Sequence, residues 1–226
     1  MNDPVFVLRP EPGLTTTLVA AFERGIKARG MPLGTVVPVS WSAPAAKFDG
    51  LLIGSANAIR HAGRELDKVA HLPVFAVGEA TAHAARDLGL QIGLVGEGGL
   101  QGLIDALPPT DRHLLRLAGE EHIWLEPASK TQITTEIVYA AKYSSLSKKQ
   151  ASVLNEGALV ILHSGAMATH FAEQCEQLGV DRSQITLAAM APRIADMAGN
   201  GWKAVHIAKA KNDAALLDLA EKLCHS

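Results

Sequence analysis

The chain has 226 residues, of which 48% are hydrophobic and 19% charged, and its formal net charge at pH 7 is −2. This length fits one large or two small domains, and the apolar share is typical of a globular chain rather than a disordered one. The near balance of charges gives no electrostatic reason to expect a nucleic-acid partner. The sequence shows neither a secretory signal at its start nor an apolar run of membrane-spanning length, so we expect a cytoplasmic protein without a membrane partner.

Cysteine and histidine usage points the same way. The two cysteines, Cys175 and Cys224, are far apart in the sequence, which is typical of reduced thiols in a cytosol-like compartment. The nine histidines are scattered, and no HxH, HExxH or CxxC spacing gathers them. The sequence therefore predicts no metal site.

Apolar, β-branched runs alternate with helical patterns along the chain. The first run, VFVL at 5–8, precedes a helical apolar pattern that ends near Gly30. Further predicted strands lie at 35–39, 51–53, 74–77, 92–95, 114–118, 136–139, 159–162, 185–190 and 204–208. Such alternation favours parallel sheets covered by helices, and this many strands favours two α/β lobes over one small sheet.

The segment DGLLIGSANAIRHA (49–62) joins a buried strand to a helix. Its apolar run ends at Gly54 and Ser55, and apolar residues at helical spacing resume at Ala58. Backbone N–H groups at this turn lack intrahelical partners. The turn contains neither GxGxxG nor GKS, so it is not a standard nucleotide-binding loop.

This strand–turn–helix recurs later in the chain. The segment at 157–175 repeats it with Ser164 in the place of Ser55. Each copy leads to a second strand–turn–helix, at 72–89 and at 185–201. Two paired copies in the same order predict two similar lobes with equivalent helix N-termini.

Polar or proline-broken stretches at 35–46 and 140–149 flank the middle of the chain. Residues 1–35 supply one strand and one helix, which is too little for a lobe, so we expect them to join the C-terminal segment. The predicted division is 1–35 with 145–226 as one lobe, 40–140 as the other, and linkers near 35–40 and 139–146. A cleft between lobes is a favoured ligand site.

Several segments in this order resemble one family, the uroporphyrinogen-III synthases of tetrapyrrole and heme biosynthesis. The segments are VLRP (7–10), FDGLLIGSANAI (48–59), VFAVGEATAHAARDLG (74–89), LRLAGEE (115–121), VYAA (138–141) and LVILHSGAMATHF (159–171). Each is a short α/β motif, and the resemblance rests on their order and spacing along nearly the whole chain.

The resemblance implies a fold and a reaction. The fold is two α/β lobes on a two-stranded linker, with the first lobe discontinuous. The reaction closes hydroxymethylbilane into uroporphyrinogen III, inverting the last pyrrole ring and losing water, with no metal or organic cofactor. We expect this small molecule as substrate and a monomeric enzyme.

The substrate carries eight carboxylates, yet the sequence has no basic run to match them. Helix N-termini offer free N–H groups and a favourable dipole to anions. The expected substrate-binding residues are Arg9, Ser55, Ala56, Asn57, Gly78, Thr81, Ser164, Gly165 and Arg193. The structural alternatives are N-caps for the two serines, a helix cap for Thr81 and a surface position for Arg9.

Tyr139 matches the family's linker tyrosine, which is placed to assist departure of the substrate hydroxyl. A phenol is a weak acid, so hydrogen bonding to the leaving oxygen is favoured over full proton transfer. The alternative is a tyrosine that only packs on its lobe.

Some positions depart from the family pattern. Where the family usually has threonines after a Gly-Pro pair, this chain has Ala191-Pro192-Arg193-Ile194, and Ala140 replaces an arginine after the linker tyrosine. His163 stands at a position that is normally aromatic or hydroxylated, which favours a partly buried structural histidine. Two other function classes stay open: a two-lobed binding protein or catalytically idle relative, and a flavodoxin-like nucleotide or flavin protein.

Overall fold

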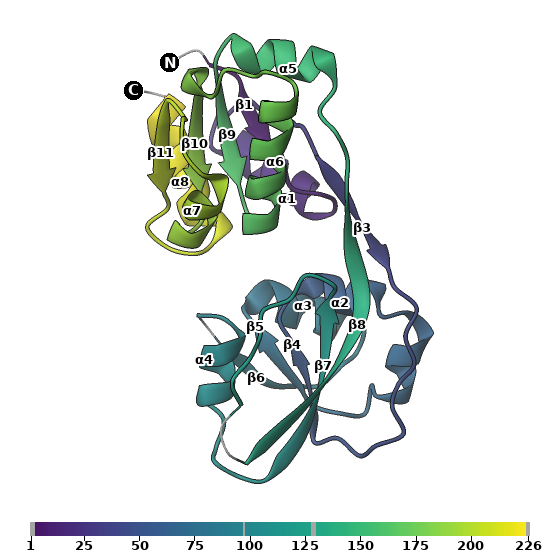
Figure 1. Cartoon of the computed structure of the whole chain (residues 1–226). Coiled ribbons are helices and arrows are strands. Elements are labelled where there is room, and N and C mark those ends of the chain that lie inside the picture. The colour runs from purple at the N-terminus through teal and green to yellow at the C-terminus, as the bar shows by residue number, and fades with distance from the viewer. Residues whose placement is uncertain (1–2, 97, 128–129, 225–226) are drawn as a thin grey trace. The chain divides into compact units, whose positions relative to one another are not determined.

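The computed structural model of the chain describes residues 3–96, 98–127 and 130–224. The chain divides into two compact units, unit 1 with Met1–Thr35 and Tyr143–Ser226, and unit 2 with Val36–Lys142 (Figure 1). Each unit has its own helix-covered sheet, which confirms the predicted α/β class. Within the three described ranges, no helix has the length and apolar character needed to cross a membrane.

Unit 1 contains a five-stranded sheet in the order β11-β10-β9-β1-β2, and its paired strands are parallel. Its strands are β1 (Val5–Val7), β2 (Ala28–Gly30), β9 (Ala158–Leu162), β10 (Ile185–Ala189) and β11 (Ala204–Ile207). Its helices are α1 (Gly13–Glu23), α5 (Lys148–Asn155), α6 (Gly165–Gln177), α7 (Pro192–Ala198) and α8 (Asp213–Cys224), with a 3₁₀ turn η2 (Arg182–Gln184). The pairing of β1 with β9 places residues from both ends of the chain in one sheet.

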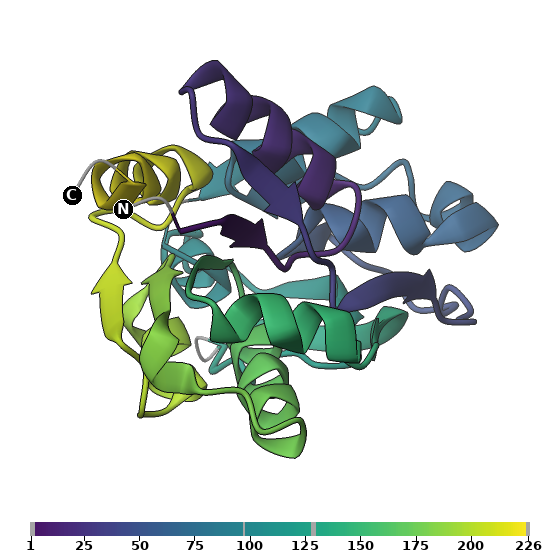
Figure 2. The ribbon, with the colours of Figure 1, turned by 90° about the horizontal axis from the view of Figure 1, so that it is seen from above.

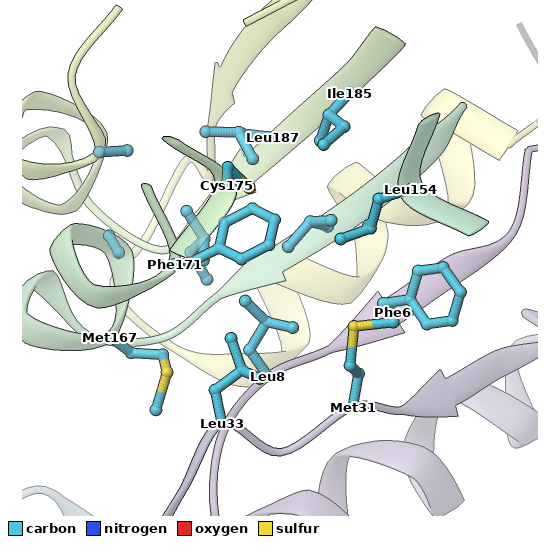
Figure 3. Close-up of a cluster of buried hydrophobic side chains, with 14 of the residues drawn as sticks. Phe6, Leu8, Met31, Leu33, Leu154, Met167, Phe171, Cys175, Ile185 and Leu187 are labelled. Atoms are coloured by element: carbon cyan, nitrogen blue, oxygen red, sulfur yellow. The ribbon is translucent and has the colours of Figure 1, made fainter. Parts of the chain in front are cut away.

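The sheet of unit 1 is covered on both faces, which explains its continuous apolar strands. All five residues of β9 are buried, as expected for a central parallel strand. Side chains alternate between faces, so Phe6 and Leu8 pack with α5, α6 and α7, while Val5 and Val7 pack with α1 and α8. Figure 2 shows the two groups of helices on opposite sides of the sheet, and Figure 3 shows the first cluster around the fully buried Phe171.

Unit 2 contains a six-stranded sheet in the order β3-β8-β7-β4-β5-β6. Its strands are β3 (Gly34–Pro38), β4 (Gly50–Ile53), β5 (Val74–Val77), β6 (Ile92–Gly96), β7 (Arg112–Gly119) and β8 (Thr131–Tyr143). Its helices are α2 (Ala56–His61), α3 (Glu79–Asp87) and α4 (Leu100–Asp105), with a 3₁₀ helix η1 (Gly63–Lys68). Helices α2 and α3 cover one face, and α4 covers the other together with Leu125.

The chain crosses between the units in β3 and at the end of β8. The N–H of Val39 donates to the carbonyl of Val138 over 2.9 Å, and the N–H of Ser144 donates to the carbonyl of Leu33 over 3.0 Å. Residue numbers rise along one strand as they fall along the other, so β3 and β8 run antiparallel at the two crossing points.

Two strands differ from the sequence prediction. The strand β2 was not predicted, because Ala28–Gly30 contains no β-branched or aromatic residue and forms through its main-chain pairing with β1. The strand β8 begins at Thr131 rather than 136, because its polar first half pairs in register with β7.

Candidate active site

In unit 2, strand β4 turns into helix α2 at Ser55. Its backbone is extended, with φ −152° and ψ 139°, and its Oγ accepts a hydrogen bond from the N–H of Asn57 over 3.3 Å. Ser55 is therefore the N-cap of α2. Ala56 and Asn57, which follow it, are half-buried. The N–H of Ala56 has no acceptor inside the helix, because it belongs to the first turn.

The next strand, β5, turns into helix α3 at Gly78. Its φ of 74° and ψ of 157° are values that glycine adopts far more readily than other residues. The expectation that Thr81 caps this helix is wrong, because Gly78 occupies the N-cap position and α3 has no side-chain cap. Thr81 is 5% exposed, so little of its surface is open to a ligand.

The register of the sheet in unit 2 aligns these turns in a row. Ile53 at the end of β4 is paired with β5 on one side and β7 on the other. Its partners are Ala76 and Leu117. Two residues further along these three parallel strands lie Ser55, Gly78 and Gly119, which are therefore level with one another at the carboxyl edge. Gly119 is in turn the register partner of Tyr139 on β8. At the usual strand spacing the row from Tyr139 to Gly78 is roughly 14 Å long, and we call these four residues the carboxyl-edge row.

A β-bulge in β8 directs the side chain of Tyr139. The register with β7 shifts between Ala118 and Gly119, which leaves Val138 as the extra residue. Val138 is fully buried, and Tyr139 packs against the same cluster on the α2–α3 face. A Cβ on Gly119 would stand 2.6 Å from Cε2 and Cζ of the Tyr139 ring and 2.9 Å from its hydroxyl oxygen, so the ring lies on the glycine.

A histidine from α2 lies near this phenol. The ring centroids of His61 and Tyr139 are 6.4 Å apart with an angle of 39° between their planes. Burial lowers the pKa of His61, and the neighbouring charge of Arg60 lowers it further. The imidazole that faces the carboxyl-edge row is therefore neutral at pH 7.

Unit 1 repeats the first turn at Ser164. Its Oγ accepts a hydrogen bond from the N–H of Met167 over 3.3 Å, so Ser164 is the N-cap of α6. A Cβ on Gly165 would overlap the sulfur of Met197 on α7. A larger residue at 165 would displace the flexible side chain of Met197, which is 37% exposed, so packing favours a small residue there without requiring one.

The second turn of unit 1 lies at Ala191, the N-cap of α7. This helix has no side-chain cap and begins with Pro192. Leu162 pairs with Ala189, so two residues further on Ser164 and Ala191 are level, as Ser55 and Gly78 are in unit 2. Arg193 is exposed, and its guanidinium makes no hydrogen bond or ion pair with the described residues.

Arg9 enters a polar cluster at the carboxyl edge of the sheet in unit 1. Its Nη1 donates to both carboxylate oxygens of Asp213, over 2.9 and 3.1 Å, and to Oγ1 of Thr17 over 3.1 Å. The Thr17 hydroxyl donates to the same carboxylate over 3.0 Å. The alternative that Arg9 is a plain surface arginine is wrong. Its charge, which the expected role would give to a substrate carboxylate, is already paired with Asp213.

His163 completes this cluster from the end of β9. Its side chain is 7% exposed, and its Nε2 lies 3.3 Å from an Asp213 oxygen without hydrogen-bond geometry. Burial lowers the pKa of His163 more than the carboxylate raises it, so we take the imidazole as neutral at pH 7. Burial acts to raise the pKa of Asp213, but its contacts with His163, Arg9 and Thr17 together lower it to about 2.

Four of these residues were missed in the sequence, among them His61, whose contact with Tyr139 has no signal in the segment at 49–62. Asp213 carries the weak signal of an acidic residue at a helix start, but nothing local indicates a partner 204 positions away. Thr17 has no sequence signal. Gly119 lies inside a quoted segment, but its contact with Tyr139 depends on the bulge. No cluster of His, Cys, Asp and Glu that would hold a metal ion occurs in the described ranges.

The fold and the site define a class of protein: an α/β protein of two units, each presenting two level helix N-termini at the carboxyl edge of a mostly parallel sheet. The family model described as "Uroporphyrinogen-III synthase HemD" matches residues 19–218. The chain belongs to the uroporphyrinogen-III synthase family.

Solved structures share the fold. The uroporphyrinogen-III synthetase of Helicobacter pylori is 16% identical, with a TM-score of 0.65 over 98% of this chain and 99% of that one. A mutant uroporphyrinogen III synthase of the extremely thermophilic bacterium Thermus thermophilus is 12% identical, with a TM-score of 0.52 over 99% of this chain and 100% of that one. A search of curated proteins finds no match.

Proposed function

We propose that this chain catalyses the closure of hydroxymethylbilane to uroporphyrinogen III, with inversion of the last pyrrole ring and loss of water. The family match over most of the chain supports this reaction. The observation that carries it here is the carboxyl-edge row, in which the phenol of Tyr139 stands level with two helix turns. The row puts one weak acid beside several main-chain donors.

In this proposal, main-chain N–H groups bind the substrate's carboxylates. The donors in unit 2 are the first-turn N–H groups after Ser55, at Ala56 and Asn57, and those after Gly78. The helix α2 has six residues, so its dipole is short and direct N–H donation matters more. Small side chains at Gly78 and Ala56 leave the main chain open to a bulky ligand.

Unit 1 supplies further donors at Ser164 and Gly165 and a cation at Arg193. Arg193 replaces the missing threonine hydroxyls with a charge, and its guanidinium suits a carboxylate. Arg9 would have to give up its ion pair with Asp213 to bind one, so we give Arg193 the larger part. The side chain of Thr81 is buried, so Thr81 takes part as a residue of the first turn of α3 and not through its hydroxyl.

Tyr139 assists the chemical step by hydrogen bonding to the substrate hydroxyl as it leaves. The lone pair of the pyrrole nitrogen expels this hydroxyl, and the resulting cation is partly stabilised by that nitrogen. The phenol need only share its proton with the departing oxygen, which suits a weak acid. Inversion of the last pyrrole ring then depends on how the protein holds the bound substrate, and Tyr139 takes no part in it.

The test is an assay with enzymically generated hydroxymethylbilane, scoring isomer III against isomer I. We expect isomer III above the background of unassisted closure, which gives isomer I. A protein that binds the substrate without raising isomer III would instead be a binding protein or an idle relative, and the missing threonine hydroxyls after Pro192 would then explain the lost activity. We also propose a monomeric, cytoplasmic enzyme, and gel filtration with light scattering checks the first point.

A further inference from the structure

The segment that joins β7 to β8 holds large apolar side chains in solvent. Trp124 is 88% exposed and Ile123 is 42% exposed, while Leu125 beside them is buried against α4. We call residues 120–126 the Trp124 loop. An indole left in water forgoes one of the largest apolar burials available to a side chain, so folding does not account for its position.

The Trp124 loop is fixed rather than frayed. The Nη1 of Arg116 donates to the carbonyl of Ile123 over 2.9 Å. At the far end, the side-chain amide of Gln101 donates to the carbonyl of Glu126 over 2.9 Å and accepts from its N–H over 3.0 Å. The main chain around Trp124 is therefore held in place while the indole itself is exposed.

Arg116 is buried and has few partners. It is 4% exposed, makes no ion pair with the described residues, and its Nε has no hydrogen-bond partner among them. Burial lowers its pKa, and the nearby Tyr139 acts to raise it. A buried guanidinium without a counter-ion is costly, and the hydrogen bond that Arg116 makes among the described residues goes to the carbonyl of Ile123.

The loop starts at the carboxyl-edge row. Glu120 directly follows Gly119, and its N–H donates to the carbonyl of Tyr139 over 2.9 Å. The exposed carboxylates of Glu120 and Glu126 flank the loop and repel the substrate's carboxylates, so any attraction to the loop has to come from the apolar face of the indole. We infer that Trp124 stacks on a pyrrole ring of the substrate, and that Arg116 is a positioning residue for it, an inference that rests on the proposed function.

The first test is kinetic. We expect Trp124→Ala to raise KM about tenfold with kcat nearly unchanged, since a stacked aromatic pair contributes on that scale. Trp124→Phe keeps an aromatic face and restores most of the loss. The matched control is Phe22→Ala, which removes an aromatic ring that is 81% exposed on α1 of unit 1 and leaves KM unchanged.

The second test reads the position of the indole. In a Trp41→Phe, Trp202→Phe background, Trp124 is the remaining tryptophan. We expect oxygen-free uroporphyrinogen III to shift its emission to shorter wavelength and to protect it from acrylamide quenching. Arg116→Met raises the concentration needed for this shift, and it adds little to the KM of Trp124→Ala because both changes act through one contact.

The outcomes separate the two proposals. An unchanged KM in Trp124→Ala, in an enzyme whose wild type forms isomer III, overturns this inference and leaves the proposed function intact. A wild type that forms no isomer III overturns both. The shielding of Trp124 could instead increase with the protein concentration and not with the concentration of uroporphyrinogen III. A second copy of the chain would then cover the indole, which also overturns the inference.

Discussion

The ring of Tyr139 lies on the Cα of Gly119, so close that a Cβ there would stand 2.6 Å from two ring carbons. The two residues are register partners on β7 and β8, beside the bulge at Val138. The absence of a side chain at 119 therefore determines where the phenol stands. If the phenol takes part in catalysis, this glycine is as important to turnover as the tyrosine.

We predict that Gly119→Ala gives a folded protein with a kcat close to that of Tyr139→Phe. The added methyl group pushes the ring off its place, and overpacking of this kind costs about 1–3 kcal/mol. Turnover of hydroxymethylbilane and thermal unfolding measure the two effects.

The control for Gly119→Ala is the same change in a Tyr139→Ala background. With the ring removed, the methyl group has space, so the second change should lower kcat no further. An equal loss in both backgrounds would mean that Gly119 acts independently of the tyrosine.

We predict that Tyr139→Phe lowers turnover without abolishing it. A positioned acid typically contributes ~10²–10⁴-fold in rate, and we expect the lower end because the pyrrole nitrogen stabilises the cation by itself. Isomer III should remain the main enzymic product, as measured by separating the isomers.

Two results would contradict this account of Tyr139. Unchanged turnover would mean that the tyrosine only packs against the α2–α3 face. A change to isomer I with turnover intact would mean that the phenol controls ring inversion rather than departure of the hydroxyl.

Much of the fold could be predicted because parallel strands buried on both faces have an unmistakable apolar pattern. Leu51–Ile53 and 159–162 are such runs, and each became a central strand with buried side chains. The strand β2 could not be predicted, since its three residues have no strand preference and pairing with β1 alone orders them. Tertiary pairing overrides local propensity there.

The site was less predictable, because its contacts join distant segments. The two serine N-caps follow from local patterns, and the structure has both. Arg9 drew attention through its resemblance to a family motif, but its partner Asp213 lies near the other end of the chain. The direction of Tyr139 depends on a bulge that reverses the face of the strand, and strand periodicity alone gives no sign of it.

We predict that Ser55→Ala lowers kcat/KM by about tenfold or less, because loss of an N-cap costs ~1 kcal/mol. Ala56→Leu should do more harm, since its side chain would cover the main-chain donors of the turn. Steady-state kinetics compares the two variants.

Ser147 offers a matched control for the cap. It caps α5 in unit 1 with a complete capping box, so Ser147→Ala should lower thermal stability by a similar amount and leave KM unchanged. A folded Ser55→Ala protein without activity would give the hydroxyl a direct chemical part and refute binding by main-chain donors.

The last prediction concerns His163 and pH. Because burial holds its pKa below the ordinary 6.5 in the folded state, the unfolded state binds more protons as pH falls. The stabilisation is complete above pH 6.5 and is lost as pH falls through the folded-state pKa. The lowered pKa of Asp213, about 2, also makes the stability fall as pH falls. It does so only below pH 3.8, the ordinary aspartate value, which lies below the pH range in which His163 acts.

Urea unfolding of unit 1 between about pH 7.5 and about pH 5 brackets the ordinary histidine pKa and measures the effect. Trp202, stacked on Phe171, reports on this unit when Trp41 and Trp124 are changed to Phe. We expect the free energy of unfolding to fall with pH, and His163→Asn to flatten the slope. His61→Asn changes another histidine whose pKa is lowered, but in unit 2, so it should leave the slope of unit 1 as it was. A slope that survives unchanged in His163→Asn would mean that other titrating groups produce it, and a wild-type stability that rises toward pH 5 would mean that the buried imidazole is protonated and paired with Asp213.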